Sequence, residues 1–368
     1  MRAHLLIPFL LFSLPLTAQQ DSSYRTWLRF TFEDDYLKPF WRNKGSIDRY
    51  YTSGLKLEYY NSNLRRQWIE KWMPYSSQYT TKSVSYAVGC NMYTPAELYQ
   101  PNVDSNDRPY AGWLYISARG TYNNTYGHPH RITVDYSAGV LGPPSLQEQL
   151  QKGFHHFINS EIHSTIPQGW GNQIGAALAL NANVRYEPSL WHSRHLDSMV
   201  LLQKATFEAF PFLEVNVGSV MDYLRVGWVF NFQTGGQPAY FQKQMTYNTV
   251  YPNFRPLPAG NLHPALSSRT TRQKFLTVEF YASPSATLVG YNATLSGGLI
   301  PFQHSPYVLT ADRVKRLYGE VDAALLLQIK CLGLMYTCTY RTLEFKGQNA
   351  LPSFWGAVSI LVLLKDHH

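Results

Sequence analysis

The sequence predicts an all-β protein, a transmembrane antiparallel β-barrel of about twelve strands with one short helix in an extracellular loop. Aromatic residues make up 15% of the chain, and charged residues also make up 15%, whereas ordinary globular domains carry about 25% charged residues. The mean hydropathy is −0.27, which is too low for a protein built from membrane-spanning helices. Many segments alternate polar and apolar residues, as the wall of such a barrel requires. Composition alone fits a secreted β-sandwich equally well.

Residues 1–18 have the pattern of a secretory signal peptide. Arg2 gives the N-terminal region a positive charge, residues 5–16 are apolar, and Leu16-Thr17-Ala18 resembles the cleavage site of a signal peptidase. We therefore expect export, with residues 19–368 forming a single barrel domain because no linker divides them.

Alternation with a period of two identifies the strands. In the first strand Leu28, Phe30 and Phe32 alternate with Arg29, Thr31 and Glu33, so one face suits lipid and the other suits water or polar partners. An even number of strands suits a barrel that closes without an exposed edge. The predicted strands lie near 24–34, 51–61, 83–93, 111–122, 130–140, 174–187, 200–216, 218–232, 273–283, 313–329, 334–345 and 354–364.

A helix interrupts the strands at about 145–159. Ser145-Leu146-Gln147-Glu148 has the form of a capping box, in which the Ser and Glu side chains satisfy free N–H groups at the start of a helix. Apolar residues then recur at helical spacing at Leu146, Leu150, Phe154 and Phe157. Such a helix has no role in spanning a membrane, so we expect it to cover or complete a site.

Polar side chains near strand ends are candidates for chemistry. The parity of the flanking strands places Asp35 and Thr52 on the polar inner face. His155 lies on the helix, and Glu161 follows it by six residues, a rotation of about 240°. The two can converge only if the helix ends near 159–160. Each of these residues can also be explained without a catalytic role: the acidic residues as a solvated turn, Thr52 as an ordinary strand residue, and His155 as a surface or packing residue. No tight zinc motif and no Gly-x-Ser-x-Gly motif occurs.

Two segments, 48–54 and 107–113, repeat the same chemistry at strand mouths. Each begins with an Asp-Arg pair, followed by an aromatic residue and small residues. Arg49 and Arg108 are therefore candidate cations at the rim of the barrel.

The formal net charge of +8 favours contact with anionic lipid headgroups. No nucleic-acid motif is present.

The chain has three cysteines, an odd number: Cys90, Cys331 and Cys338. Cys331 and Cys338 could form a disulfide, but packing as small apolar residues is the favoured interpretation.

The chain resembles the lipid A 3′-O-deacylase (LpxR-like) family of outer-membrane enzymes. The matching motifs occur in order over about residues 28–174, with a looser match at 341–345. They are Glu33-Asp34-Asp35, 48–54, Met92-Tyr93-Thr94-Pro95, 107–113, 139–143, Gln151 with His155, and Gly169-Trp170-Gly171-Asn172-Gln173.

The resemblance implies a twelve-stranded barrel in the outer membrane of a Gram-negative bacterium, with a site between the wall and a loop helix near the extracellular rim. It implies an esterase acting on lipid A of lipopolysaccharide, with His155 as general base and with Asp35 and Thr52 in the catalytic site. It also implies a Ca²⁺ ion bound by Asp34 and Glu161. Oxygen ligands of this kind suit Ca²⁺.

This chain departs from the family at two places. Asp34 stands where relatives usually carry Asn, and residues 96–106 lack the basic pair that some relatives use for substrate phosphate. Arg49 or Arg108 could hold that phosphate instead. The alternatives are a non-catalytic barrel that acts as a pore or surface-binding protein, and a soluble secreted β-sandwich hydrolase. The sequence leaves the oligomeric state, the acyl chain removed and the native metal open.

Overall fold

A computed structural model describes the barrel, its loop helix and part of its loops. The signal segment predicted at 1–18 and Cys331 lie outside the described residues. The residues described are 26–37, 49–61, 81–98, 101, 104–124, 130–162, 166–188, 194–196, 205–234, 277–329, 332–348 and 352–364.

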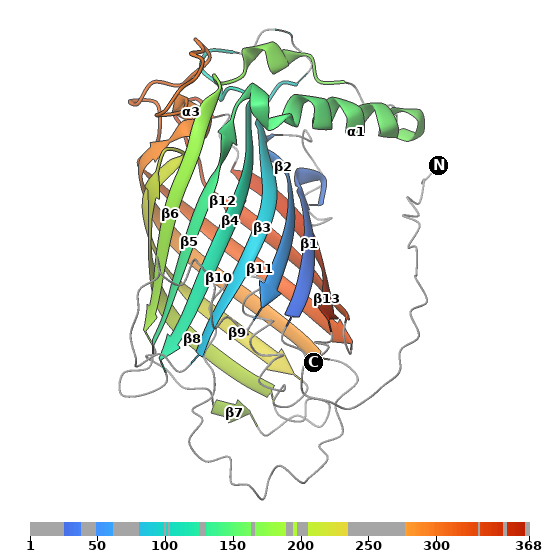
Figure 1. Cartoon of the computed structure of the whole chain (residues 1–368), viewed down its shortest axis with the longest axis vertical. Coiled ribbons are helices and arrows are strands. Elements are labelled where there is room, and N and C mark those ends of the chain that lie inside the picture. Colours follow the sequence, from blue (N-terminus) through green and yellow to red (C-terminus); the bar gives the residue numbers. More distant parts are fainter. Residues whose placement is uncertain are drawn as a thin grey trace, which may run out of the picture.

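Twelve antiparallel strands form a closed barrel (Figure 1). Consecutive strands pair along the chain, β13 closes on β1, and β6 closes on β8. The short strand β7 (Arg194–Leu196) pairs only with β8 and lies outside the ring. The barrel strands are β1 (Thr26–Asp34), β2 (Tyr50–Asn61), β3 (Thr81–Thr94), β4 (Ala111–Asn124), β5 (His130–Leu141), β6 (Ala177–Pro188), β8 (Ala205–Gly218), β9 (Met221–Thr234), β10 (Thr277–Asn292), β11 (Leu317–Ile329), β12 (Leu332–Arg341) and β13 (Ser353–Leu364).

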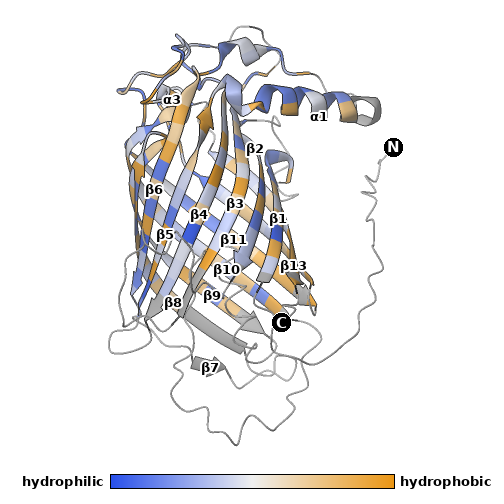
Figure 2. Cartoon of the chain, in the orientation of Figure 1, coloured by the Kyte–Doolittle hydropathy of each residue, from blue (hydrophilic) through white to orange (hydrophobic). Residues whose placement is uncertain are grey.

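The two faces of the wall have the character that alternation predicted. On β1, Phe30 is exposed on the outside, whereas Arg29 and Thr31 are buried inside. The same holds on β11, where Leu325 is exposed and Glu320 is buried. Figure 2 shows apolar and polar residues alternating along the strands. The closed barrel excludes the soluble β-sandwich reading.

Side chains fill the inside of the barrel. An apolar cluster that includes Trp27, Phe212 and Leu326 crosses the lumen near the end where Thr26 pairs with Leu364, which we call the terminal end. A second cluster, including Tyr93, Leu141 and Trp355, lies near the opposite end. Between them is a polar cavity of about 450 Å³. The described lumen is therefore not an open channel.

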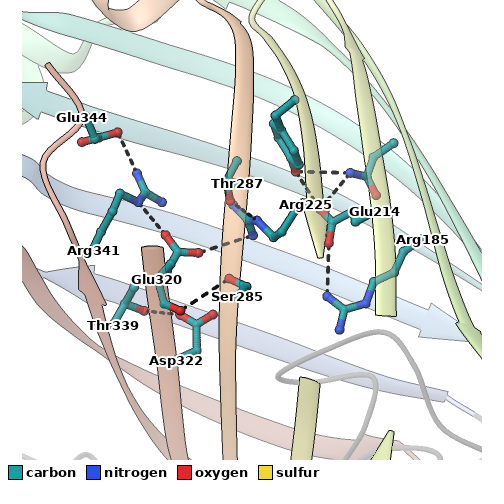
Figure 3. A network of polar contacts seen from close by, with 12 residues as sticks. Arg185, Glu214, Arg225, Ser285, Thr287, Glu320, Asp322, Thr339, Arg341 and Glu344 are labelled. Carbon is teal, nitrogen blue, oxygen red and sulfur yellow. Dashed lines mark hydrogen bonds and ion pairs between the residues drawn. The ribbon is translucent and has the colours of Figure 1, made fainter. Parts of the chain in front are cut away.

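Ion pairs join the strands around this cavity (Figure 3). Arg185 of β6 lies 3.1 Å from Glu214 of β8, and Glu320 of β11 lies 2.5 Å from Arg341 of β12. Arg225 of β9 reaches the same Glu320 at 3.4 Å. Because both charges of each pair are largely buried, loss of one partner would leave the other uncompensated. The pairs therefore fix the strands that surround the lumen.

The helix α1 (Gln147–Ile162) lies at the end of the barrel opposite the terminal end, and we call its end the helix end (Figure 1). It starts two residues later and ends three residues later than the sequence predicted. The predicted capping box does not form, because the Ser145 hydroxyl donates to the Gly142 carbonyl at 2.6 Å, in the short helix η4 (Pro143–Ser145). Leu146, with φ of 60°, then turns the chain into α1. No described helix has the length and hydropathy to cross a membrane.

Candidate functional site

A β-bulge turns Thr52 to the outer side of the wall. The pairing of β2 with β3 shifts register between Tyr51 and Ser53, so Thr52 has no partner in the ladder. Tyr51 points inward, since its hydroxyl donates to Glu33, which lines the lumen cavity. The Thr52 hydroxyl instead lies 2.6 Å from that of Thr94. The expected inward direction of Thr52 is therefore wrong, because a bulge places an extra residue in the strand and reverses the alternation.

Thr94 belongs to the outer face of β3. It shares parity with Val88, which is exposed on the outside, and with Met92. Met92 is buried on that side against Leu98, Tyr110 and Trp170. Thr52 and Thr94 thus lie on the outer surface of the wall, where loops cover it.

A row of residues in register crosses this outer surface at the helix end. Asp34 of β1 is opposite Ser53 of β2, Ser53 is opposite Met92 of β3, and Met92 is opposite Gly112 of β4. Asp34 shares the parity of the outward-facing Phe30. The row therefore runs along the outside of the barrel from the acidic pair to the strand that supports α1.

The helix α1 packs on the far end of this row. A Cβ at Gly112 would lie 2.7 Å from Cγ of Gln147 and 2.0 Å from Oγ of Ser145, so only glycine lets the start of α1 approach β4 this closely. Gln147 also forms a hydrogen bond with the Cys90 thiol of β3. In Figure 1, α1 leaves the rim near β4 and extends toward the side of the barrel that carries β1 and β2.

The buried face of α1 is polar. Gln147, Gln151 and His155 follow one another at intervals of four residues, and each is buried. Trp170, in the short helix η5 (Gly169–Asn172), donates from Nε1 to Oε1 of Gln151 at 2.7 Å and packs against Tyr110. His155 is 6% exposed, one turn beyond Gln151. The helix thus presents two side-chain amides and one imidazole toward the protein.

The acidic pair lies at the start of the row. Asp34 ends β1, and its Oδ1 accepts a hydrogen bond from the Tyr36 amide at 2.8 Å. Asp35 begins the short helix η1 (Asp35–Leu37), so strand parity does not extend to it, and its Oδ2 accepts from the Arg49 amide at 2.8 Å. Both carboxylates are buried. Neighbouring buried carboxylates suit a hard cation in their donor chemistry. Among the described residues, however, no three His, Cys, Asp or Glu side chains gather closely enough to hold a metal by themselves.

The expectation for Glu161 depended on the end of the helix. The chain remains helical through Ile162, so Glu161 lies in the last turn of α1 and not on the following loop. A continuous helix turns by about 240° between positions 155 and 161. The helix end expected near 159–160 is therefore wrong. The convergence of the two side chains stays a prediction, because the side chain of Glu161 lies outside the described residues.

Arg108 is not available to a substrate. Its side chain is 0% exposed, donates to the Thr294 hydroxyl at 3.0 Å, lies 3.7 Å from Glu344 and stacks over the Tyr93 ring. Burial lowers the pKa of this guanidinium and raises the pKa of the adjacent Asp107. Arg108 therefore ties the loop before β4 to α3 (Ala293–Ser296) and to Glu344. The substrate-contact prediction for Arg108 is wrong because the helix-end loops cover it.

Arg49 has different surroundings from Arg108. It is only partly buried, its amide binds Asp35, and its Nε has no hydrogen-bond partner among the described residues. The two similar Asp-Arg segments thus have different roles: the second anchors loops, and the first borders the acidic pair.

Several site residues were not recognised as such from the sequence. Gln147 and Gln151 precede His155 at intervals of four residues, which puts the three side chains on one face of the helix. This spacing is visible in the sequence and could have identified them. Trp170 and Thr94 lie within motifs already noted, but only the fold shows that Trp170 bonds Gln151 and that Thr94 contacts Thr52. The sequence contains no local indication of either contact.

The structure thus places Asp34 and Thr52 on the neighbouring strands β1 and β2, with Asp35 in η1 directly after β1. It buries His155 on α1, which packs on β3 and β4. An imidazole, two carboxylates and hydroxyl groups can together accept a proton and bind a cation. The strand residues among them, Asp34 and Thr52, lie in or beside the outward row.

The chain matches the family model described as "Outer membrane protein LpxR" over residues 5–364. The solved structure of LpxR from Salmonella typhimurium is similar to it with a TM-score of 0.65 at 16% identity, covering 92% of this chain and 100% of that one. The β-domain of the Bordetella autotransporter BrkA aligns with a TM-score of 0.36 at 10% identity, covering 92% and 98% of the two chains, a likeness too weak to carry an argument. No curated protein matches the chain.

Proposed function

Because this chain belongs to the LpxR family of outer membrane proteins, we propose that it is an outer-membrane esterase that hydrolyses a 3′-O-linked acyl chain of lipid A. The observation that supports this most is the position of His155, a buried imidazole on the polar face of a helix that packs against the outer wall of a barrel. A buried polar face on a rim helix has no use in spanning a membrane. It suits a site that a membrane lipid enters from the side.

His155 would act as the general base. A neutral imidazole can accept a proton near neutral pH, so His155 would take a proton from a water molecule as the oxygen of that water attacks the ester carbonyl carbon. The bond between this carbon and the sugar oxygen then breaks. The departing sugar oxygen takes the proton from the imidazolium. The products are a free fatty acid and a lipid A with a free 3′ hydroxyl.

Gln151 and Trp170 would position the base. The hydrogen bond from Trp170 fixes Gln151, one turn before His155, and so fixes the rotation of α1 about its own axis. Correct orientation of reacting groups contributes a large part of enzymatic rate acceleration.

A divalent cation, proposed to be Ca²⁺, would be held by Asp34 with Asp35 beside it. When bound, it would stabilise negative charge on the ester carbonyl oxygen. The carboxylate of Asp34 adds one negative charge relative to the Asn usual in relatives, which strengthens attraction for a cation. Arg49, beside this pair and only partly buried, is the proposed contact for a substrate phosphate.

The non-catalytic pore is less well supported, because apolar side chains fill the described lumen at two levels. Export by a signal peptide at residues 1–18 remains part of the proposal.

Mass spectrometry of lipid A extracted from outer membranes with and without this protein tests the function. We expect a species that has lost one ester-linked 3′ acyl chain only when the protein is present. Identical lipid A profiles with a correctly folded barrel in the membrane would contradict the proposed activity.

A further inference from the structure

We propose that α1 is an interfacial helix whose apolar stripe, formed by Leu150, Phe154 and Phe157, lies in the hydrocarbon of the bilayer leaflet at the helix end. This goes beyond the proposed chemistry and does not depend on it. The helix would hold the site at the depth where acyl chains meet headgroups.

The apolar residues of α1 form one stripe and are largely exposed. Phe157 is 79% exposed, Phe154 is 48% exposed and Leu150 is 41% exposed. At about 100° per residue these three side chains fall within about 60° of arc on the helix. Leu146, just before the helix, is exposed as well. Leaving three large apolar side chains in water would be costly, so this stripe indicates an apolar environment.

The opposite face of α1 is charged. Glu148, Lys152 and His156 lie about 160° to 240° around the helix from Leu150. Lys152 and Glu148 form an ion pair of 2.7 Å, and His156 is exposed. An apolar face opposite a charged face is the pattern of a helix that lies in a membrane interface.

The third face fixes how the helix is oriented. Gln147, Gln151 and His155 lie between the other two faces and are buried against the protein. Because Gly112 and Cys90 hold Gln147, and Trp170 holds Gln151, the helix cannot rotate its apolar stripe inward without breaking these contacts.

The stripe continues a surface that already faces lipid. Gln147 packs on the outer side of β4 at Gly112, four residues before Ile116, which is 65% exposed on the same side. Ile116 lines an apolar groove of about 850 Å³ on the outer wall, together with Leu57 and Val88 of the neighbouring strands. Figure 2 shows α1 projecting sideways from the barrel at this rim. Since the outer wall of a membrane barrel contacts hydrocarbon, acyl chains are the occupant that this position favours.

Spin labelling tests the proposal in vesicles of phosphatidylethanolamine and phosphatidylglycerol, which contain no lipid A. Nitroxide labels are attached to Phe154→Cys and Phe157→Cys in the full chain, with Cys331 and Cys338 replaced by alanine and with Cys90 replaced by serine, whose hydroxyl can keep the hydrogen bond with Gln147. Matched controls are Gln149→Cys, about 80° around the helix from Phe157, and His156→Cys on the charged face. Electron paramagnetic resonance then compares the accessibility of each label to oxygen, which enters hydrocarbon, and to a water-soluble nickel complex.

We expect a higher ratio of oxygen to nickel accessibility at positions 154 and 157 than at positions 149 and 156. Equal ratios at all four positions would overturn the proposal.

If the cysteine-free chain does not fold, photocrosslinking in the native chain replaces the spin labels. The photoreactive residue p-benzoylphenylalanine then stands in place of Phe157, and a chain with the same residue in place of His156 is the control. Irradiation should yield a phospholipid adduct from position 157 and a smaller yield from position 156; equal yields would overturn the proposal. Because neither experiment needs catalysis, the result is distinguishable from failure of the proposed esterase activity.

Discussion

The side chain of Gln147 rests directly on the backbone of Gly112, so that a Cβ at Gly112 would lie 2.7 Å from Cγ of Gln147. This close approach joins the helix that carries His155 to the outer side of β4. The position of the proposed base therefore depends on Gly112, because Gln147 lies about two helical turns before His155 on the same helix.

Gly112→Val should therefore impair activity without opening the barrel. The added side chain must push the start of α1 outward, and a misplacement of about 1 Å can cost about a hundredfold in rate. Deacylation assays, with gel mobility before and after heating as the test of folding, measure both effects. Gly153→Ala is the matched control, because a Cβ at Gly153 meets no atom within 4 Å. Equal activity of both variants would show that this contact does not position the site.

Arg108→Ala should reduce stability and should not selectively weaken substrate binding. Removing one partner of a buried ion pair costs about 3 kcal/mol or more, and Thr294 would also lose its donor. Urea unfolding in detergent micelles measures this loss. A fully stable variant with a raised KM would instead restore the substrate-contact role for Arg108.

Arg49→Gln should have the opposite effect, raising KM while the unfolding midpoint stays unchanged. Its backbone amide still donates to Asp35, so the local structure is retained. The comparison of the two arginines separates a loop anchor from a phosphate contact. An unchanged KM for Arg49→Gln would remove this residue from substrate binding.

Trp170→Phe should lower kcat about fivefold. The substitution keeps the ring that packs on Tyr110 but removes the donor to Gln151, a bond worth about 1 kcal/mol. Trp113→Phe is the control, since Nε1 of Trp113 has no hydrogen-bond partner among the described residues. Equal kcat values for the two variants would argue against a positioning role for Trp170.

Chelation by EDTA should abolish activity, and added Ca²⁺ should restore it. Asp34→Asn should raise the Ca²⁺ concentration that gives half-maximal activity, because it removes one negative charge from the proposed ligand. Titration of activity with Ca²⁺ measures this shift. Activity that persists in EDTA would exclude the proposed role of the cation.

Most of the fold could be predicted from alternation, because lipid on one side and a polar interior on the other impose a period of two on every strand. All twelve predicted segments overlap barrel strands. The terminal segment near 354–364 closes the ring as β13, paired with β1 over Thr26–Asp34.

The direction of Thr52 could not be predicted in this way. Alternation assumes an unbroken ladder, whereas the bulge beside Tyr51 reverses the face at the site itself. The end of α1 was also missed, because Asn159-Ser160 resembles a helix end but the chain continues to Ile162. Burial of Arg108 depends on Thr294 and Glu344, which are far away in the sequence, so no local pattern indicates it.

His155→Ala tests the central claim most directly, with His156→Ala as the neighbouring control on the exposed side of α1. Each variant is expressed in outer membranes, its folding is checked by gel mobility, and its lipid A is analysed by mass spectrometry. We predict that lipid A keeps its 3′ acyl chain with His155→Ala and loses it with His156→Ala. Unchanged deacylation by a folded His155→Ala barrel would contradict the account.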